Sequence, residues 1–408
     1  MKCRFCQNEL THEFIDLVNS PPSNSFLSIE ELNEPEVFYP LKLFVCEKCF
    51  LVQIDEYKKS EEIFSDRYAY FSSFSSTWLE HARQYVEMIT ARMGLNDEDF
   101  TVEIGSNDGY LLQYFKEKNI PCLGIEPAKS TADVARDKGI DVISEFFDVK
   151  LAERLLKKGR KANLIVGNNV LAHVPNINDF VKGLKILLEK NGVITLEFPH
   201  LMRLVEENQF DTIYHEHFSY LSFYTVNRIF SEHRLILFDV DELPTHGGSL
   251  RIYAGHQEDH SKKLSPNVEA LNEKESAAGM GDLSYYLGFQ EKANKVKYKL
   301  LSFLLTKKRE GKKVVAYGAA AKGNTLLNYC GIKKDLIQFV VDASPHKQGK
   351  FLPGNHIPVV SEDLLRKTRP DFALILPWNI KNEIMGQLEY IREWGAHFVI
   401  PIPELAIV

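Results

Sequence analysis

Residues 101–115, TVEIGSNDGYLLQYF, decide the fold of the central part of the chain. A short β-rich apolar run ends near Glu103, two glycines let the backbone turn closely, and a helical pattern begins. Further short apolar runs, separated by helical patterns, follow at residues 121–127, 162–167 and 191–199. This alternation predicts an α/β domain with a parallel sheet and helical crossovers.

The same stretch predicts a cofactor site. Its spacing is Glu-x-Gly-x-x-x-Gly, from Glu103 through Gly105 to Gly109, with Asn107 between the glycines. The next strand ends in Glu126, whose carboxylate can bind ribose hydroxyls. An acidic residue before the first glycine suits the cationic amino acid of S-adenosylmethionine better than the pyrophosphate of NAD, which favours Gly-x-Gly-x-x-Gly. We expect S-adenosylmethionine, with NAD or a turn without cofactor as alternatives.

Two later segments are expected to face that cofactor. Phe147 falls where adenine is usually held, and Asn168, Asn169 and His173 follow the strand-like run LIVG. Ligands of open α/β sheets sit at the carboxyl ends of strands, so we expect both asparagines at the cofactor. His173 is expected between cofactor and substrate, and capping of the following helix is its alternative role.

A chain of 408 residues is too long for one ordinary core. We expect domains at residues 1–66, 67–284 and 285–408. The third contains a second strand–glycine–helix pattern, KKVVAYGAAAKGNTLLNYCG, and is predicted to be a second Rossmann-like α/β domain. Residues 256–284 are polar and weakly patterned, which predicts a linker or surface excursion.

Composition narrows the class of protein. A net charge of −7 argues against a nucleic-acid surface. No apolar run approaches the roughly 20 residues of a membrane span, and the first residues, MKCRFCQNEL, lack the apolar stretch of a secretion signal. We expect a cytoplasmic protein, monomeric by default, that binds neither nucleic acid nor membrane.

Four of the six cysteines form two Cys-x-x-Cys pairs, Cys3/Cys6 and Cys46/Cys49. Four thiolates are enough to close a tetrahedral structural zinc site. In a reducing compartment metal ligation is favoured over disulfides, and unligated thiols are the alternative. Such a closed site would stabilise the N-terminal module rather than perform chemistry.

The stretch YHEHFSYLS places Tyr214, His215, Glu216 and His217 together. Two histidines at i and i+2 do not match the helical zinc motif, so a metal site there is disfavoured. A strand without chemistry is a second alternative, because aromatic neighbours suit a sheet. Acid–base catalysis beside a methyl donor is the preferred hypothesis, with Glu216 orienting an imidazole and Tyr214 donating to a developing oxyanion.

Taken together, these motifs resemble the nucleotide-sugar C-methyltransferases, such as the sugar C-3'-methyltransferase of tetronitrose biosynthesis. The resemblance runs nearly end to end. It includes the four cysteines, YAYFSSFSSTW at 68–78, VEIGSNDGYLL, NNVLAHVPN, YHEHFSYLS, HGGSLRIY at 246–253 and GAAAKGNTLLNY at 318–329. It implies a zinc-binding N-terminal domain, a class I S-adenosylmethionine domain and a C-terminal α/β domain that helps to hold a nucleotide sugar.

The resemblance also implies roles for single residues. It makes His217 the base that removes the C3 proton of a nucleotide-linked 4-keto-6-deoxy sugar, a choice over His215 that spacing alone does not support. Tyr214, His173 and a tyrosine of the YAYFSS segment become its partners. Within that segment we favour Tyr70 over Tyr68.

Two glycine-containing turns are expected to contact the substrate. His246 precedes Gly247-Gly248, either in a loop that reaches the active site or in a simple tight turn. In GAAAKGNT a helix N-terminus and Lys322 favour a phosphate. The substrate set there is Lys322, Asn324, Thr325 and, from the run SPHKQGKFLPG, Lys347.

The sequence therefore predicts an S-adenosylmethionine-dependent C-methyltransferase of a nucleotide-linked ketosugar. Deprotonation beside the C4 carbonyl would give an enolate whose carbon attacks the methyl group in line. An O- or N-methyltransferase of a small molecule is one alternative. A zinc-ribbon interaction protein without catalysis is the other.

Overall fold

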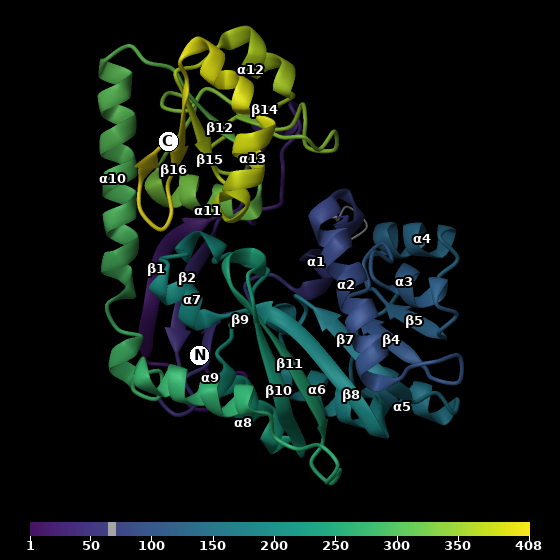
Figure 1. Ribbon diagram of the computed structural model, residues 1–408. Coiled ribbons are helices and arrows are strands. Elements are labelled where there is room, and N and C mark those ends of the chain that lie inside the picture. Colours follow the sequence, from purple (N-terminus) through teal and green to yellow (C-terminus); the bar gives the residue numbers. More distant parts are fainter. Residues whose placement is uncertain (64–70) are drawn as a thin grey trace.

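The computed structural model describes residues 1–63 and 71–408 and contains three sheets (Figure 1). They have four, seven and six strands, and they follow the N-terminal, central and C-terminal parts of the chain with one exception, strand β9. The predicted domain boundary at residue 66 lies outside the described residues, and the one at 284 falls in a short 3₁₀ helix. Both boundaries stay predictions.

The N-terminal sheet is antiparallel, with the order β1-β2-β3-β9. In β2, Leu41, Leu43 and Val45 alternate with more exposed residues, so one face of the strand meets the core. The fourth strand, β9, belongs in sequence to the central domain. The strands are β1 (His12–Ser20), β2 (Tyr39–Val45), β3 (Val52–Ile54) and β9 (Ser219–Tyr220), and the same part of the chain contains η1 (Glu31–Asn33) and α1 (Ser60–Ile63).

The central sheet has the order β10-β11-β8-β7-β4-β5-β6 and is parallel except for β11. This is the predicted parallel sheet with helical crossovers. Its strands are β4 (Thr101–Ile104), β5 (Cys122–Ile125), β6 (Val142–Ile143), β7 (Ala162–Asn168), β8 (Leu188–Pro199), β10 (Leu235–Leu243) and β11 (Ser249–His256).

Helices cover this sheet, and short 3₁₀ turns connect several of its elements (Figure 1). The helices are α2 (Ser76–Met93), α3 (Leu112–Glu117), α4 (Lys129–Asp137), α5 (Val149–Lys157), α6 (Ile177–Leu187) and α8 (Phe223–Glu232), whereas α7 (Leu201–Glu206) packs in the cluster of the N-terminal strands. The turns are η2 (Ser72–Phe74), η3 (Leu171–His173), η4 (Phe210–Thr212) and η5 (Thr245–Gly247).

The polar segment after β11 is more ordered than a linker. It contains helix α9 (Pro266–Ala277), which packs on α8 and β10, and turn η6 (Leu283–Tyr285). Val268, Leu271 and Glu275 of α9 are buried. The expectation of a linker was therefore wrong for this helix, because its inward face carries few apolar residues and one buried carboxylate.

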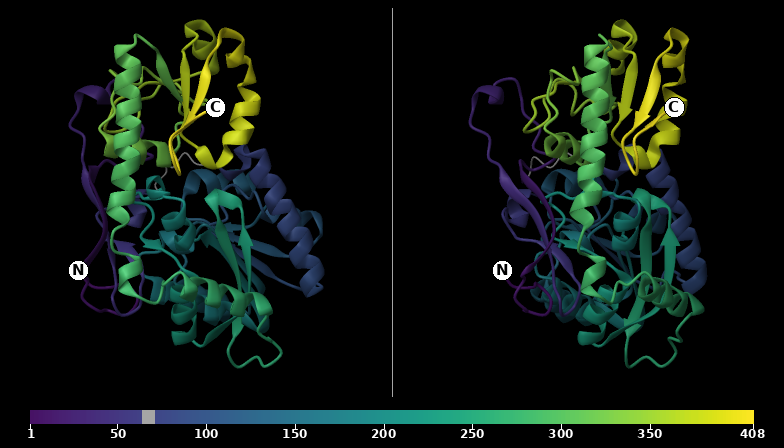
Figure 2. Two further views of the ribbon diagram at one scale, coloured as in Figure 1. Left: turned by 60° about the vertical axis from the view of Figure 1, so that its left-hand side comes forward. Right: turned by 90° about the vertical axis from the view of Figure 1, so that its left-hand side faces the viewer.

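The long helix α10 (Phe289–Arg309) connects the N-terminal and C-terminal parts of the molecule. It contacts β1, α11 and β12, and it runs beside both sheets in each view (Figures 1 and 2). Buried residues of α10, of the N-terminal strands and of the C-terminal sheet form one hydrophobic cluster. These two parts of the chain therefore share a core.

The C-terminal sheet has the order β14-β13-β12-β15-β16-β17, parallel except for β17. After β12 the chain adds β13 and β14 on one side of that strand and then β15 on its other side. A crevice is therefore expected at the carboxyl ends of β12, β13 and β15. The strands are β12 (Val314–Tyr317), β13 (Val340–Val341), β14 (Val359–Val360), β15 (Phe372–Ile375), β16 (His397–Ile400) and β17 (Ala406–Ile407). The helices are α11 (Ala321–Cys330), α12 (Glu362–Thr368) and α13 (Lys381–Gln387), with turns η7 (Trp378–Ile380) and η8 (Glu389–Trp394).

In the part of the chain that the structure describes, no helix combines the length and apolar character needed to cross a membrane.

Candidate active site

The turn after β4 is shaped to accept a ligand at the carboxyl edge of the central sheet. Gly105 has φ +67°, and a Cβ atom there would lie 2.6 Å from Cγ2 of Val170. The carboxylate of Glu103 is fully buried, and the described residue that hydrogen-bonds to it is Tyr110. Burial raises the pKa of Glu103 well above its ordinary value. A buried carboxylate beside this cradle fits the cationic amino acid of S-adenosylmethionine.

The backbone around Glu126 and Asn107 supports the same cradle. Glu126 accepts hydrogen bonds from the N–H groups of Asn107 and Ala128, both at 2.9 Å. Asn107 adopts a left-handed φ of +48°, which asparagine tolerates better than most residues. Gly109 has φ +76°. The residues predicted from the glycine motif thus meet at one edge.

Phe147 lies deeper than expected. Its ring is buried and packs edge to face on Phe180 of α6, with the centroids 5.5 Å apart. The neighbouring Phe146 is more exposed. A direct contact between Phe147 and adenine stays a prediction.

The two asparagines after β7 point to different partners. Asn168 donates to the hydroxyl of Tyr110 at 3.2 Å. Asn169, with φ +56°, brings its Nδ2 within 2.9 Å of Nε2 of His246. His246 also has positive φ, +55°, and it comes from the β10–β11 turn. That turn therefore reaches the carboxyl edge of the sheet.

A buried carboxylate that the motifs did not indicate holds this turn. Glu197, at the end of β8, accepts from the hydroxyl of Thr245 at 2.8 Å. His81 and Arg251 contact its other oxygen at 2.9 and 3.0 Å. Isolated polar residues far apart in sequence gave no spacing signal for this network.

The Tyr-His-Glu-His segment is a turn and not a strand. The N–H of His217 donates to the carbonyl of Tyr214 at 3.0 Å, and β9 begins only at Ser219. His215 points toward the N-terminal module, where its Nε2 contacts the carbonyl of Pro40 at 3.2 Å. The strand alternative was therefore wrong, and the two histidines face different surroundings.

His217 lies in a cluster of aromatic and imidazole rings. Its ring centroid is 4.1 Å from that of Tyr214 and 4.6 Å from that of His173. Its Nδ1 is 3.2 Å from the carbonyl of Thr212. A carbonyl only accepts, so Nδ1 carries the proton and Nε2 keeps a lone pair. Nε2 makes no hydrogen bond within residues 1–63 and 71–408.

The environment keeps both imidazoles neutral. Burial, followed by repulsion from the neighbouring His173 once that ring is protonated, lowers the pKa of His217 well below its ordinary value. Burial lowers the pKa of His173 to about 4, and its Nδ1 donates to the carbonyl of Glu216 at 2.7 Å. The Nε2 lone pair of the neutral His217 imidazole can accept a proton from a bound molecule.

Glu216 contacts the cluster through its backbone. Its carboxylate accepts instead from Nδ2 of Asn24 in the N-terminal module, at 2.7 Å. Burial raises the pKa of this carboxyl group. The residue thus connects the module to the turn that carries His217.

Lys322 approaches from the C-terminal domain. It lies in the first turn of α11, and its ammonium donates to Asn379 at 2.7 Å and sits 4.7 Å from the ring centre of Trp378. Lys322 is also among the charges that lower the pKa of His217. The C-terminal domain therefore contributes charge next to the histidine cluster.

The remaining predicted substrate residues are partly engaged elsewhere. Asn324 and Thr325 are buried, and the Thr325 hydroxyl donates to the carbonyl of Ile213 at 2.8 Å, just before the histidine turn. Lys347 donates to the carbonyl of Ala319 at 2.9 Å, in the turn that precedes α11. Direct contacts of these residues with substrate stay predictions.

Asp211 was missed by sequence reasoning because no motif contains it. It is fully buried and accepts from the indole N–H of Trp378 at 2.7 Å. Burial raises its pKa to about 7, although Lys322 opposes that shift. It joins the segment just before the histidine turn to the C-terminal domain.

The predicted tyrosines of the YAYFSS segment, Tyr68 and Tyr70, lie outside the described residues.

The four predicted cysteine ligands converge. Their sulfur atoms all lie within 4.8 Å of one another, and this is the only such group of possible metal ligands in the described residues. Cys3, Cys46 and Cys49 are fully buried. Four thiols this close fit a tetrahedral zinc site, whereas the histidine turn forms no metal-ligand group in the described part of the chain.

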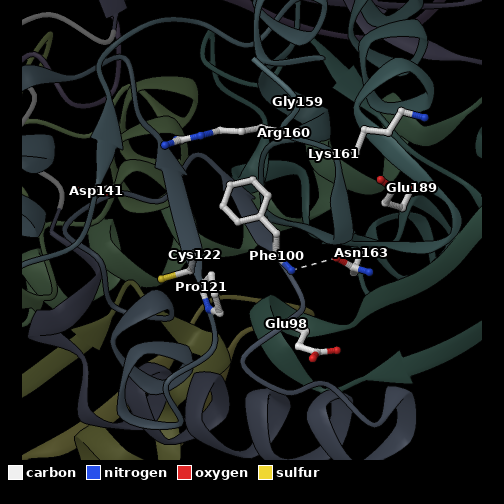
Figure 3. Close-up of a pocket in the computed structure, with 10 residues that line it drawn as sticks. All are labelled: Glu98, Phe100, Pro121, Cys122, Asp141, Gly159, Arg160, Lys161, Asn163 and Glu189. Carbon is white, nitrogen blue, oxygen red and sulfur yellow. Dashed lines mark hydrogen bonds between the residues drawn. The ribbon is translucent and has the colours of Figure 1, made fainter. Parts of the chain in front are cut away.

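One hollow in the described residues lies away from these groups. It has a volume of about 640 Å³ and is lined by Phe100, Cys122, Arg160 and seven other residues at the amino ends of β4, β5 and β7 (Figure 3). The histidine cluster and the glycine turn lie at the opposite, carboxyl ends. Ligands of such sheets bind at the carboxyl ends, so the chemistry of the site argues against this hollow as the active site.

Comparisons with known proteins agree with this layout. Family models match residues 3–64 as a zinc binding domain, 78–234 as a methyltransferase domain and 244–403 as a C-methyltransferase C-terminal domain. The C-methyltransferase NovU of Streptomyces niveus is 32% identical over 408 residues, which is 100% of this chain and 96% of NovU.

Two solved structures resemble part of the chain. A methyltransferase of Clostridium acetobutylicum that depends on S-adenosylmethionine has a TM-score of 0.35 and 10% identity, covering 44% of this chain and 92% of its own. The magnesium protoporphyrin IX methyltransferase of Synechocystis, with S-adenosylmethionine bound, has a TM-score of 0.33 and 14% identity, covering 48% and 88%. The chain belongs to the C-methyltransferase family that includes NovU, and it is a methyltransferase that depends on S-adenosylmethionine and carries a zinc-binding domain.

Proposed function

We propose that this C-methyltransferase acts on a nucleotide-linked 4-keto-6-deoxy sugar, at C3, with His217 as the base. The observation that carries the proposal is the neutral imidazole of His217, with Nδ1 donating to Thr212 and Nε2 left without a hydrogen bond in the described residues. Carbon methylation needs such a base, because the carbon must first lose a proton to become nucleophilic.

The proposed reaction begins at the sugar. The C4 carbonyl acidifies the C3–H bond, and Nε2 of His217 accepts that proton, leaving an enolate. The hydroxyl of Tyr214 donates to the enolate oxygen, and His173 borders the same space. Bound S-adenosylmethionine supplies the electrophilic methyl group that the C3 carbon attacks. If base and donor lie on opposite faces of the sugar, configuration at C3 inverts.

The proposal also assigns residues that hold the cofactor and the substrate. Glu103, Gly105, Asn107, Gly109 and Glu126 line the cofactor cradle described above. Lys322, at the start of α11, would meet the diphosphate, because a helix N-terminus and an ammonium both favour anionic oxygens. His246 would contact the sugar from the β10–β11 turn. A cytoplasmic location and a monomeric state stay predictions.

The test is direct. The purified protein is incubated with methyl-labelled S-adenosylmethionine and a panel of nucleotide-linked 4-keto-6-deoxy sugars, and products are read by mass spectrometry. We expect one added methyl group on the sugar carbon. In deuterated water without the methyl donor, deuterium should enter C3. Transfer to oxygen or nitrogen only, with no deuterium uptake, would contradict the proposal.

A further inference from the structure

Arg4 lies inside the first zinc knuckle, directly after Cys3. Its guanidinium extends from the knuckle into the central domain. Nη1 donates to the carbonyl of Pro175 in the central domain at 2.8 Å, and Nη2 donates to the carbonyl of Ile54, in β3 of the N-terminal sheet, at 2.5 Å. One side chain therefore connects the metal site to two other segments.

Both segments lead to the proposed catalytic histidines. Pro175 follows His173 by two residues. The N–H of Ile54 donates to the carbonyl of Phe218 at 3.2 Å, and Phe218 directly follows His217. The guanidinium carbon of Arg4 also lies 5.4 Å from the ring centre of Phe218. Arg4 thus touches the chain next to each histidine, and the two imidazoles lie 4.6 Å apart.

The zinc side of this connection is fixed as well. The N–H of Arg4 donates to Oε1 of Gln53 at 2.8 Å, and Nε2 of Gln53 contacts Sγ of Cys3 at 3.3 Å. Asn178 of α6 donates to the carbonyls of Arg4 and Phe5 at 3.3 and 2.9 Å. The backbone at position 4 is therefore set by the metal ligand and by the central domain together.

The guanidinium of Arg4 differs from that of an arginine that stabilises a fold through an ion pair. No carboxylate of the described residues forms an ion pair with Arg4, and its Nε has no partner there. The carboxylates of Glu56 and Asp55 act on the guanidinium from a distance, whereas its direct hydrogen bonds go to the two carbonyls. A planar fork can reach two carbonyls at once, which a single ammonium cannot do in the same geometry.

We propose that Arg4 is a positioning residue that couples the zinc knuckle to the pairing of His173 and His217. Zinc holds the backbone at Arg4, the guanidinium holds Pro175 and Ile54, and these hold the two imidazoles at their separation. The inference rests on the proposed catalytic role of the two histidines. It assigns the zinc site a part in the geometry of the reaction in addition to its part in folding.

Arg228 provides a matched control. Its Nη1 donates to the carbonyl of Lys48 in the second knuckle at 2.8 Å, and its guanidinium lies 5.6 Å from the ring centre of Tyr224. It has the same chemistry beside the same metal, but it contacts neither histidine-bearing segment. The variants to compare are Arg4→Lys, Arg4→Met and Arg228→Lys, each made in the full zinc-loaded chain.

Three readouts separate positioning from stability. Zinc content by mass spectrometry and melting temperature report the fold. Histidine signals of protein labelled with ¹³C at Cε1, assigned with His173→Gln and His217→Gln, report the imidazoles without any substrate. Turnover and deuterium uptake at C3 report the reaction. We expect both Arg4 variants to keep zinc, to shift the two histidine signals, and to lose about 10- to 100-fold in turnover, because small misplacements of reacting groups have such effects.

Arg228→Lys should leave the histidine signals and turnover as in the unmodified protein. Unchanged histidine signals in both Arg4 variants would overturn the inference. So would loss of zinc in proportion to the loss of turnover, because Arg4 would then serve only the metal site. If the signals move but no variant or parent protein methylates a ketosugar, the proposed function fails while the coupling by Arg4 stands.

Discussion

At the scale of single residues, His217 and His215 make a natural comparison. His217→Gln should lower turnover by about 10²–10⁴-fold, because it removes the proposed base, while affinity for S-adenosylmethionine stays near normal. His215→Gln is the matched control, because His215 faces Pro40 in the N-terminal module and not His173. Turnover assays and calorimetric titration of the donor check both. Retained activity in His217→Gln would remove the assignment of the base.

The pH dependence of turnover follows from the lowered pKa of His217. The neutral imidazole is the active form, so kcat/KM should stay high below pH 6.5 and fall only as the pH drops through the lowered value. Repulsion from His173, once that ring is protonated, contributes to that lowering. In His173→Gln the pKa of His217 should rise, and the acidic limb of the residual activity should move to higher pH. A profile that moves to lower pH would contradict this electrostatic account.

Single residues also mark where sequence reasoning stopped. The cysteines, the glycine turn and the histidine turn carry spacing that points to their chemistry. Glu197, Asp211 and Arg4 do not, because each is a lone polar residue whose partners come from distant parts of the chain. The spacing of His215 and His217 gives no reason to prefer either as the base. The structure distinguishes them, because the turn places them in different surroundings.

At the scale of elements, the turn from β4 to α3 allows a sharp test. Gly105→Ala should abolish binding of S-adenosylmethionine, because φ is +67° and the new Cβ would lie 2.6 Å from Val170. Gly94→Ala is the control: its φ is +69°, but nothing lies within 4 Å. The control should cost about 1 kcal/mol of stability through the left-handed backbone and leave donor affinity unchanged. Calorimetric titration distinguishes the two.

Zinc removal should loosen a defined set of strands. Metal binding supplies much of the folding free energy of small zinc modules, so a chelator should expose β1, β2 and β3 to hydrogen exchange. Because β9 pairs with β3, the peptide that contains residues 214–222 should lose protection with them, while β4, β5 and β7 keep theirs. Hydrogen exchange followed by mass spectrometry measures this. Loss of protection in β4 at the same chelator concentration would contradict it.

Elements with a regular pattern were predictable from sequence. The strand–glycine–helix patterns at residues 101–115 and 312–331 appear as β4 followed by α3 and as β12 followed by α11. Helix α9 was missed because a buried glutamate, Glu275, faces inward and accepts from His200 and from the N–H groups of Phe223 and Tyr224. Strand β9 has only two residues, too few for any period to show.

At the scale of the whole molecule, Asp211 joins the central and C-terminal domains, and its buried carboxyl group lowers the folding stability as the pH rises. Its pKa is raised from 3.8 to about 7, so its contribution to stability is present below pH 3.8 and is lost as the pH rises through about 7. Asp211→Asn cannot ionise and should be more stable at pH 8, by at most about 4 kcal/mol, with no difference below pH 4. Melting temperatures at the two pH values check this. Exposed Asp335, changed to Asn, is the control.

The same replacement should weaken turnover, because Lys322 loses the carboxylate that it faces. A variant that is more stable and less active is the expected signature of a charge kept for function. A variant destabilised at pH 8 would show that the carboxylate serves the fold.

The place of β9 in the N-terminal sheet also affects how the molecule is assembled during synthesis. β3 ends at Ile54, but its neighbour β9 begins at Ser219. A ribosome delivers the cysteine knuckles early and their fourth strand only after most of the central sheet has emerged. The order of translation and the order of assembly therefore differ, and a nascent chain that stops before Tyr220 carries metal ligands on a sheet with an open edge.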